Sequence, residues 1–196
     1  MTLLLASKSA ARAAILKGAG VAFEVVSAGV DEGPLKADAV AKGKSPLQIA
    51  ERLAEAKAAA ASRDSLDLTI GADQTLDLDG RLFDKAETLE EAREALKTLR
   101  GRTHKLHAAV ALAQDGRTIW RDVQTASLTV RDFSDAFLDQ YLARNAGAAL
   151  ACVGGYELEG EGAQLFSAID GDYFTILGLP ILPLLAELRR LEILPA

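Results

Sequence analysis

Three Asp-Gly pairs constrain the fold of this chain more than any other feature of its sequence. They are Asp79-Gly80, Asp115-Gly116 and Asp170-Gly171, and each lies between two runs of β-type residues. An Asp-Gly pair in that setting is the strongest short-range signal for a β-hairpin, because Asp and Gly both tolerate the positive φ of the turn. The sequence therefore predicts three antiparallel hairpins. Their flanking strands are expected at 75–78 with 81–83, 104–113 with 118–130, and 164–169 with 173–177.

The remaining segments are assigned by their apolar spacing. Pro46 favours the start of a helix, because proline is preferred in a first helical turn. Residues 28–45 are rich in Gly, Asp and Lys and are expected to form a loop. The other strands are expected at 3–5, 21–26 and 66–72. The helices are expected at 10–16, 46–61, 88–99, 133–144 and 180–191.

Hairpins and separate helices, rather than strict alternation of strand and helix, indicate the fold class. We expect an α/β protein with a mixed, partly antiparallel twisted sheet and flanking helices. The sequence contains no internal repeat and no clear linker. It therefore predicts a single domain over residues 1–196, with two lobes around a deep cleft.

Charge and residue counts exclude several classes of site. The net charge of −6 argues against broad binding of polymeric nucleic acid, so any phosphate must be held by a few local cations. Cys152 is the only cysteine, which excludes an internal disulfide and a thiolate metal cluster, and two histidines exclude a three-histidine metal site. The apolar run at 3–6 is too short for a secretory core or a membrane span. We expect a cytoplasmic protein without a membrane segment.

The segment LASKSAAR at residues 5–12 is a candidate anion site. A strand that leads into a Ser-capped helix presents free backbone N–H groups and the positive end of the helix dipole. Ser7 adds a hydroxyl donor, and Arg12 lies about one turn into the helix. The alternative is ordinary capping with solvated cations. The segment contains no P-loop motif.

Acidic residues near the end of the third predicted strand are candidates for metal binding or base catalysis. Ile70 and Ala72 continue the apolar face of that strand, so Asp73 points to the opposite face. A carboxylate there could act as a base or hold a hard cation. Either Asp31 or Glu32, in the loop after Val30, could share that metal, although a solvated loop is at least an equal alternative. Asp77 and Asp79 are expected to face water beside the turn.

Two lysines and one late loop complete the candidates. Lys57 extends the inward stripe of the helix that starts at Pro46, so it either reaches water or faces an anion in a cleft. Lys85 has the same two interpretations. Glu159 lies in a Gly- and Glu-rich loop and could accept hydrogen bonds from the edge of a nucleobase. His104 is expected to be structural.

Taken in order, these segments resemble the Maf family of nucleotide pyrophosphatases over nearly the whole chain. That resemblance implies an α/β sheet with a deep cleft, similar to that of inosine triphosphate pyrophosphatases. It also implies hydrolysis of a nucleoside triphosphate to the monophosphate and pyrophosphate, with Mg²⁺ or Mn²⁺. The matching segments are LASKSAAR, Asp31-Glu32, RLAEAKA (52–58), GADQ (71–74), Lys85, RGRTH (100–104), GGYELEG (154–160) and GLP (178–180).

The same resemblance implies roles for individual residues. Asp73 matches the catalytic aspartate and, with Glu32, the metal site. The matching phosphate-binding residues are Ser7, Arg12, Lys57 and Lys85. Gln74 and Glu159 match positions that select the base, and this pair resembles the branch that acts on 7-methylguanosine triphosphate. Carboxylates suit guanine physically, because its edge offers N–H donors.

Departures from the family pattern keep two alternatives open. Ala11 stands where the family usually has a second arginine, and Ala10 and Ala86 replace prolines. Loss of the arginine removes one potential bidentate phosphate contact. The alternatives are a nucleotide-binding regulator of septum formation with little catalysis, and a pyrophosphatase that prefers dTTP or UTP. The family also suggests a homodimer.

Overall fold

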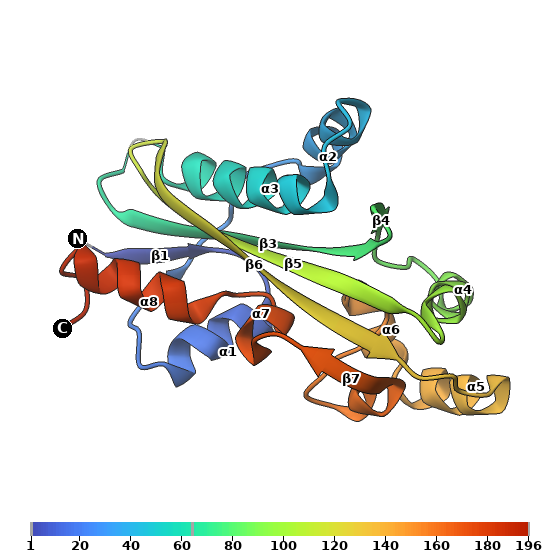
Figure 1. Cartoon of the computed structure of the whole chain (residues 1–196). Coiled ribbons are helices and arrows are strands. Elements are labelled where there is room, and N and C mark those ends of the chain that lie inside the picture. The colour runs from blue at the N-terminus through green and yellow to red at the C-terminus, as the bar shows by residue number, and fades with distance from the viewer. Residues whose placement is uncertain (1, 64, 196) are drawn as a thin grey trace.

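The chain is organised around one seven-stranded sheet with strand order β2-β1-β3-β5-β6-β7, and β4 pairs with the end of β3 (Figure 1). The computed structural model describes residues 2–63 and 65–195. β1 is parallel to β2 and β3, whereas the other pairs are antiparallel, so the predicted mixed α/β class is confirmed. The strands are β1 (Leu3–Ala6), β2 (Glu24–Val25), β3 (Leu68–Leu78), β4 (Arg81–Phe83), β5 (Thr103–Gln114), β6 (Arg117–Val130) and β7 (Phe166–Asp170).

Two of the three predicted hairpins form as expected. Asp79 and Gly80 join β3 to β4 with φ of 54° and 82°, and Asp115 and Gly116 join β5 to β6 with φ of 50° and 71°. Positive φ at both turn residues gives a twist that matches the flanking strands. The strands expected at 66–72 and 75–78 are one continuous strand, β3.

The third predicted hairpin, at Asp170-Gly171, is wrong. β7 pairs antiparallel with β6, which precedes it in the sequence. The residues after Gly171 form the helix α7 (Tyr173–Ile176) instead of a second hairpin strand. The cause is Asp172, whose carboxylate accepts a hydrogen bond from the backbone N–H of Thr175 at 2.8 Å and caps the helix. A strong cap directly after the Asp-Gly pair outweighs the turn signal.

The five expected helices are present. They are α1 (Ala10–Gly18), α3 (Pro46–Ala61), α4 (Leu89–Leu99), α5 (Asp135–Arg144) and α8 (Ile181–Arg190). Hydroxyl side chains cap four of them at the N-terminus: Ser9, Ser45, Thr88 and Ser134. Two short elements that the sequence did not indicate, α6 (Ala146–Ala151) and the 3₁₀-helix η1 (Glu161–Leu165), also form.

The expected loop at 28–45 is also wrong, because it contains the helix α2 (Glu32–Ala41). Asp31 caps this helix by accepting a hydrogen bond from the N–H of Gly33. Ala39 is its only fully buried side chain, so the apolar stripe by which a helix is recognised is missing. This correction matters for the site, because it places Glu32 in the first turn of a helix.

Helices cover both faces of the sheet, and β3 alternates between them. α3 lies along one face, and α1 and α8 lie on the other (Figure 1). Ile70 and Ala72 belong to the buried cluster under α1 and α8. Gly71 faces α3 so closely that an added Cβ would lie 2.2 Å from the carbonyl oxygen of Ala54. Asp73 therefore points to the α3 face, as the alternation predicts.

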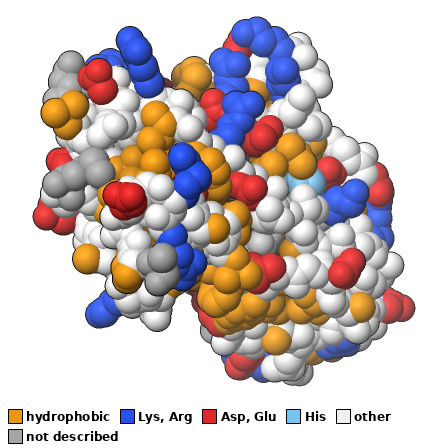
Figure 2. Space-filling view, turned by 60° about the vertical axis from the view of Figure 1, so that its left-hand side comes forward, with side chains coloured by type: hydrophobic (Ala, Val, Ile, Leu, Met, Phe, Trp, Pro, Cys, Tyr) orange, Lys and Arg blue, Asp and Glu red, His pale blue; other side chains and the backbone are white. Residues whose placement is uncertain are grey.

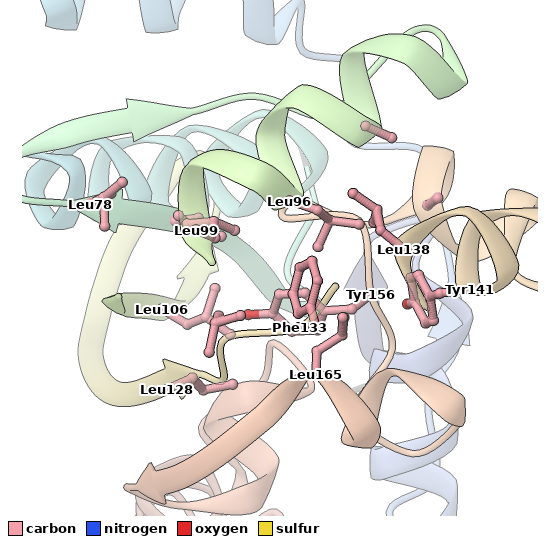
Figure 3. Close-up of a cluster of buried hydrophobic side chains, with 14 of the residues drawn as sticks. Leu78, Leu96, Leu99, Leu106, Leu128, Phe133, Leu138, Tyr141, Tyr156 and Leu165 are labelled. Atoms are coloured by element: carbon pink, nitrogen blue, oxygen red, sulfur yellow. The ribbon is translucent and has the colours of Figure 1, made fainter. Parts of the chain in front are cut away.

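A second core lies at the other end of the sheet, under α4 and α5. In Figure 3 the side chains of Leu96, Phe133 and Tyr156 lie close together within this cluster. Tyr156 places its hydroxyl 2.6 Å from Nε2 of His104, which is 1% exposed. The other ring nitrogen of His104 is buried without a hydrogen-bond partner among the described residues. His104 is thus a core residue, as expected.

Acidification is expected to destabilise the protein through His104. Burial lowers the pKa of His104 from 6.5 to about 4, so the folded protein holds the ring neutral where the unfolded chain would protonate it. This contribution to the free energy of unfolding is complete above pH 6.5 and is lost as the pH falls toward 4, by roughly 3 kcal/mol. Urea unfolding of wild type and His104→Gln between pH 4 and 7 measures it. A difference between the two proteins that does not change with pH would contradict the assignment.

None of the helices in the described part of the chain is long and apolar enough to cross a membrane.

Candidate functional site

The site lies where the sheet is incomplete. β1 pairs with β3 only as far as Gly71, and β4 pairs with β3 only from Leu76. Between them, residues 72–75 have a strand neighbour only on the β5 side. This gap opens beyond the carboxyl end of β1, which is where ligands bind in many open α/β sheets.

A cleft of about 790 Å³ lies at this gap in the sheet. It is lined by side chains from segments that lie far apart in the sequence. All eight residues that the sequence analysis selected line it: Ser7, Arg12, Glu32, Lys57, Asp73, Gln74, Lys85 and Glu159. The fold thus brings the candidates into one shared cavity.

Lys57 lies between the two carboxylates of the site. Its Nζ is 2.6 Å from Oδ1 of Asp73 and 2.9 Å from Oε2 of Glu32. Lys57 and Asp73 are 8% and 11% exposed, whereas Glu32 is 51% exposed. Lys57 reaches Asp73 because Gly71 lets α3 pack directly on β3. One ammonium balances two carboxylates, so this group carries a net negative charge and favours a further cation.

Arg12 reaches across the gap and fixes the unpaired edge of β3. Its Nη1 donates to the carbonyl of Ala72 at 3.0 Å and to Oγ of Ser7 at 3.1 Å, and its Nε donates to the carbonyl of Gly178 at 2.8 Å. Burial lowers the pKa of the guanidinium, and the nearby carboxylates of Asp73 and Glu32 oppose that shift. Arg12 therefore joins α1, β3 and the loop before α8, and its Nη2 group has no hydrogen-bond partner among the described residues.

Gln74 is held on the opposite side of β3 from Asp73. Its Nε2 donates to the carbonyls of Thr175 and Ile176, both at 2.9 Å. Because both N–H groups are used by α7, the amide oxygen is the group that can face a ligand. Helix α7, which the sequence did not indicate, thus fixes the orientation of this side chain.

Lys36 is a cleft residue that the sequence analysis missed. It lies one helical turn after Glu32 on α2, so the two side chains project from the same face. Its Nζ forms an ion pair with Asp84, from the segment that follows β4. Burial lowers the pKa of Lys36, and Asp73 and Glu32 oppose that shift. The spacing of Glu32 and Lys36 would have indicated this residue only if 28–45 had been assigned as a helix.

The far end of the cleft combines acidic and apolar groups. Glu159 is exposed at its edge, together with Glu157, and Phe83 forms part of the wall. Cys152 also lines the cleft, but burial and then the charge of Glu157 raise the pKa of its thiol to about 11. The thiol is therefore protonated at neutral pH, which argues against a thiolate nucleophile.

Both aspartates beside the β3–β4 turn were expected to face water, and only one of them does. Asp79 is exposed and pairs with Arg102. Asp77 is only 16% exposed, accepts a hydrogen bond from the N–H of Gly80 and lies 3.3 Å from Nε2 of His107. Asp77 therefore supports the turn instead of facing water, because the tight turn directs the Gly80 N–H at it.

Glu32 and Asp73 offer the type of oxygen ligand that a divalent cation prefers. Both offer hard carboxylate oxygens, and both already converge on the same cationic group, Lys57 Nζ. The described residues contain no cluster of three or more His, Cys, Asp or Glu side chains able to hold a metal. That set suits Mg²⁺ or Mn²⁺ held by one or two carboxylates together with substrate phosphates, more than a cation held by protein alone.

The face of the molecule in Figure 2 carries charges of both signs. On the face in Figure 2, Lys and Arg side chains lie among Asp and Glu side chains, not in one continuous area. A nucleic-acid strand needs an extended cationic surface, which this face lacks.

Comparisons with known proteins cover almost the whole chain. A family described as Maf-like protein matches residues 2–191. A Nucleoside triphosphate pyrophosphatase from Caulobacter vibrioides is 60% identical over 185 residues, which is 94% of this chain and 93% of that protein. A 7-methyl-GTP pyrophosphatase from Brucella abortus is 49% identical over 189 residues, which is 96% of this chain and 95% of that protein.

Among solved structures, a HAM1 protein from Coxiella burnetii is similar over 66% of this chain and 73% of that chain, with a TM-score of 0.45 and 15% identity. That likeness is too weak to support a conclusion.

Proposed function

This chain belongs to the Maf-like protein family, and from that premise we propose that it hydrolyses nucleoside triphosphates to the monophosphate and pyrophosphate. One observation carries the proposal. A buried carboxylate, Asp73, and five cations line a single cleft of about 790 Å³; the cations are Lys8, Arg12, Lys36, Lys57 and Lys85. Such an arrangement suits a small polyanion that is attacked at one phosphorus atom.

The polyphosphate is held at the end of the cleft near α1. There the N-terminus of α1 and the hydroxyl of Ser7 offer donors, and Lys57 and Lys85 offer positive charge. As pyrophosphate leaves, negative charge grows on its oxygens, and fixed cations in a partly buried site stabilise that change.

Glu32 and Asp73 would hold a divalent cation, Mg²⁺ or Mn²⁺, together with the substrate phosphates. A cation bound there neutralises phosphate charge and orients the phosphate chain. Lys57, already in contact with both carboxylates, keeps the two side chains in place.

Asp73 positions and deprotonates the attacking water. Its Oδ1 accepts the hydrogen bond from Lys57 Nζ, so Oδ2 is the oxygen that can accept a proton from water. The water attacks the α-phosphorus, the bond to the bridging oxygen breaks, and pyrophosphate departs.

For the nucleobase we propose a guanine derivative, with 7-methylguanosine triphosphate as the preferred substrate. The amide oxygen of Gln74 and the carboxylate of Glu159 are acceptors, and guanine presents N1–H and N2–H donors. Methylation at N7 gives the base a positive charge, which the acidic residues Glu157 and Glu159 favour.

Pyrophosphate release from a panel of nucleotides tests the function. The panel comprises 7-methyl-GTP, GTP, UTP and dTTP, each assayed with Mg²⁺, with Mn²⁺ and with excess EDTA. We expect cation-dependent release, highest for 7-methyl-GTP, and none with EDTA. Nucleotide binding without release under any condition would instead indicate a regulator, and a maximum at dTTP or UTP would contradict the base assignment.

Glu159→Gln is expected to weaken the preference for 7-methyl-GTP over UTP. The substitution keeps the size of the side chain but replaces an acceptor-only carboxylate with an amide that repels one N–H donor. A charged hydrogen bond is worth about 1.5–3 kcal/mol, so kcat/KM for 7-methyl-GTP falls roughly 10- to 100-fold. The ratio of kcat/KM values for the two nucleotides measures the change. An unaltered ratio would exclude Glu159 from base recognition.

A further inference from the structure

Lys36 occupies an unusual position for a surface lysine. Its side chain is 28% exposed, lines the same cleft as Asp73 and Lys57, and projects from α2 one turn after Glu32. It does not line the adjoining smaller cavity of about 400 Å³, which Glu32 and Lys57 share. Lys36 is thus directed toward the compartment that contains Arg12 and Lys85.

The partner of Lys36, Asp84, is the more exposed member of the ion pair. Asp84 is 68% exposed, so it can turn into water at little cost. Lys36 is only 28% exposed and lines the cleft, so it has less access to water than Asp84. When an anion enters, Asp84 is therefore the group that leaves and Lys36 is the group that stays.

Several cations of the cleft are already paired with protein groups before a polyphosphate binds. Lys57 already forms ion pairs with Glu32 and Asp73, and Arg12 donates hydrogen bonds to two backbone carbonyls and to Ser7. Lys8, Lys36 and Lys85 are the other cations that line the cavity, and a triphosphate carries enough negative charge to contact several of them. Lysine suits this exchange, since its ammonium is a point charge on a flexible stem that contacts phosphate from many directions.

We propose that Lys36 binds the polyphosphate of the substrate. In the free protein Lys36 is paired with Asp84, and the substrate displaces Asp84 when it binds. This inference rests on the proposed pyrophosphatase function and adds a binding residue to it. Asp84 thus competes with substrate for Lys36, and the two side chains have opposite effects on affinity.

The experiment compares three single variants with wild type in the pyrophosphate-release assay. Lys36→Met keeps the apolar stem and removes the charge, and it is expected to raise KM roughly 10- to 100-fold. Asp84→Asn removes the competitor and is expected to lower KM about two- to five-fold. Lys42→Met is the control, because Lys42 caps the other end of α2, pairs with Asp38 and does not line either cavity, so KM should not change.

A purely structural bridge between α2 and the β4–α4 segment predicts a different result. Both Lys36→Met and Asp84→Asn would then weaken binding in parallel, and either that outcome or an unchanged KM in Lys36→Met overturns the proposal. Calorimetric titration with inorganic tripolyphosphate gives the second readout. If wild type hydrolyses no nucleotide, the function fails, yet the titration still shows whether Lys36→Met loses polyphosphate affinity.

Discussion

Asp73→Asn is expected to lower the turnover of nucleoside triphosphates about 10²- to 10⁴-fold, the usual contribution of a general base. Asn matches the carboxylate in shape and can still contact Lys57, but it cannot accept a proton from water at neutral pH. Glu32 remains beside Lys57, so the buried ammonium keeps one anionic partner and the fold persists. Single-turnover release of pyrophosphate at saturating nucleotide measures the chemical step, and thermal unfolding checks the fold.

Asp77→Asn is the matched control for that experiment. Asp77 lies on the same strand and the same face of β3, four residues further along, but it does not line the cleft. It supports the turn by accepting the N–H of Gly80, so its loss is expected to affect stability slightly and turnover hardly at all. Equal turnover in both variants, or near-normal turnover in Asp73→Asn, would remove Asp73 from the mechanism.

The predictable part of the fold is the part set by local chemistry. Asp-Gly turns at Asp79 and Asp115, the proline at the start of α3 and the hydroxyl caps are each determined by a few adjacent residues. Alternation along β3 likewise places Asp73 on the face opposite to Ile70, without any knowledge of what packs there. Such signals do not depend on distant segments, and for that reason they are read correctly from the sequence.

Tertiary contacts contribute to both failures, at α2 and at α7. α2 fully buries only Ala39, which packs with Leu35 against a small cluster, and ion pairs also join the helix to α3 and to Asp84. The segment after Gly171 becomes α7 because Asp172 caps it and because Gln74 binds two of its carbonyls. The contacts of Gln74 join residues 101 and 102 positions apart, and the ion pairs of α2 join residues 14 to 48 positions apart, so neither set leaves a periodic pattern.

The candidate site likewise has features that the sequence predicts and features that depend on the three-dimensional fold. Its residue types and approximate positions followed from the resemblance to a known family, whereas their convergence depends on a sheet with a gap along one edge of β3. Lys36 was missed because it belongs to the unrecognised helix. The anchoring of Gln74, which decides which of its atoms faces a ligand, could not be read from a sequence that gave no sign of α7.

Gly71→Ala is expected to destabilise the protein by about 3 kcal/mol or more, at the upper end of the cost of overpacking. The added Cβ would lie 2.2 Å from the carbonyl oxygen of Ala54 and 2.5 Å from the backbone nitrogen of Ala58. Both are backbone atoms of α3, so no side chain can rotate away and the helix itself must move from the sheet. α3 carries Lys57, and a shift of ~1 Å between Lys57 and Asp73 is expected to lower turnover about 10²-fold.

Gly147→Ala is the matched control, since Gly147 lies in the helix α6 and an added Cβ meets nothing within 4 Å there. At that position alanine is expected to stabilise the protein by about 0.4–1 kcal/mol, because it restricts the unfolded chain more than glycine does. Urea unfolding of both variants gives the two free energies, and pyrophosphate release gives the turnover. Should Gly71→Ala unfold at the same urea concentration as wild type, close packing of α3 on β3 could not be what joins Lys57 to Asp73. If it is destabilised but retains full turnover, the ion pair tolerates the displacement, and its geometry does not limit the chemical step.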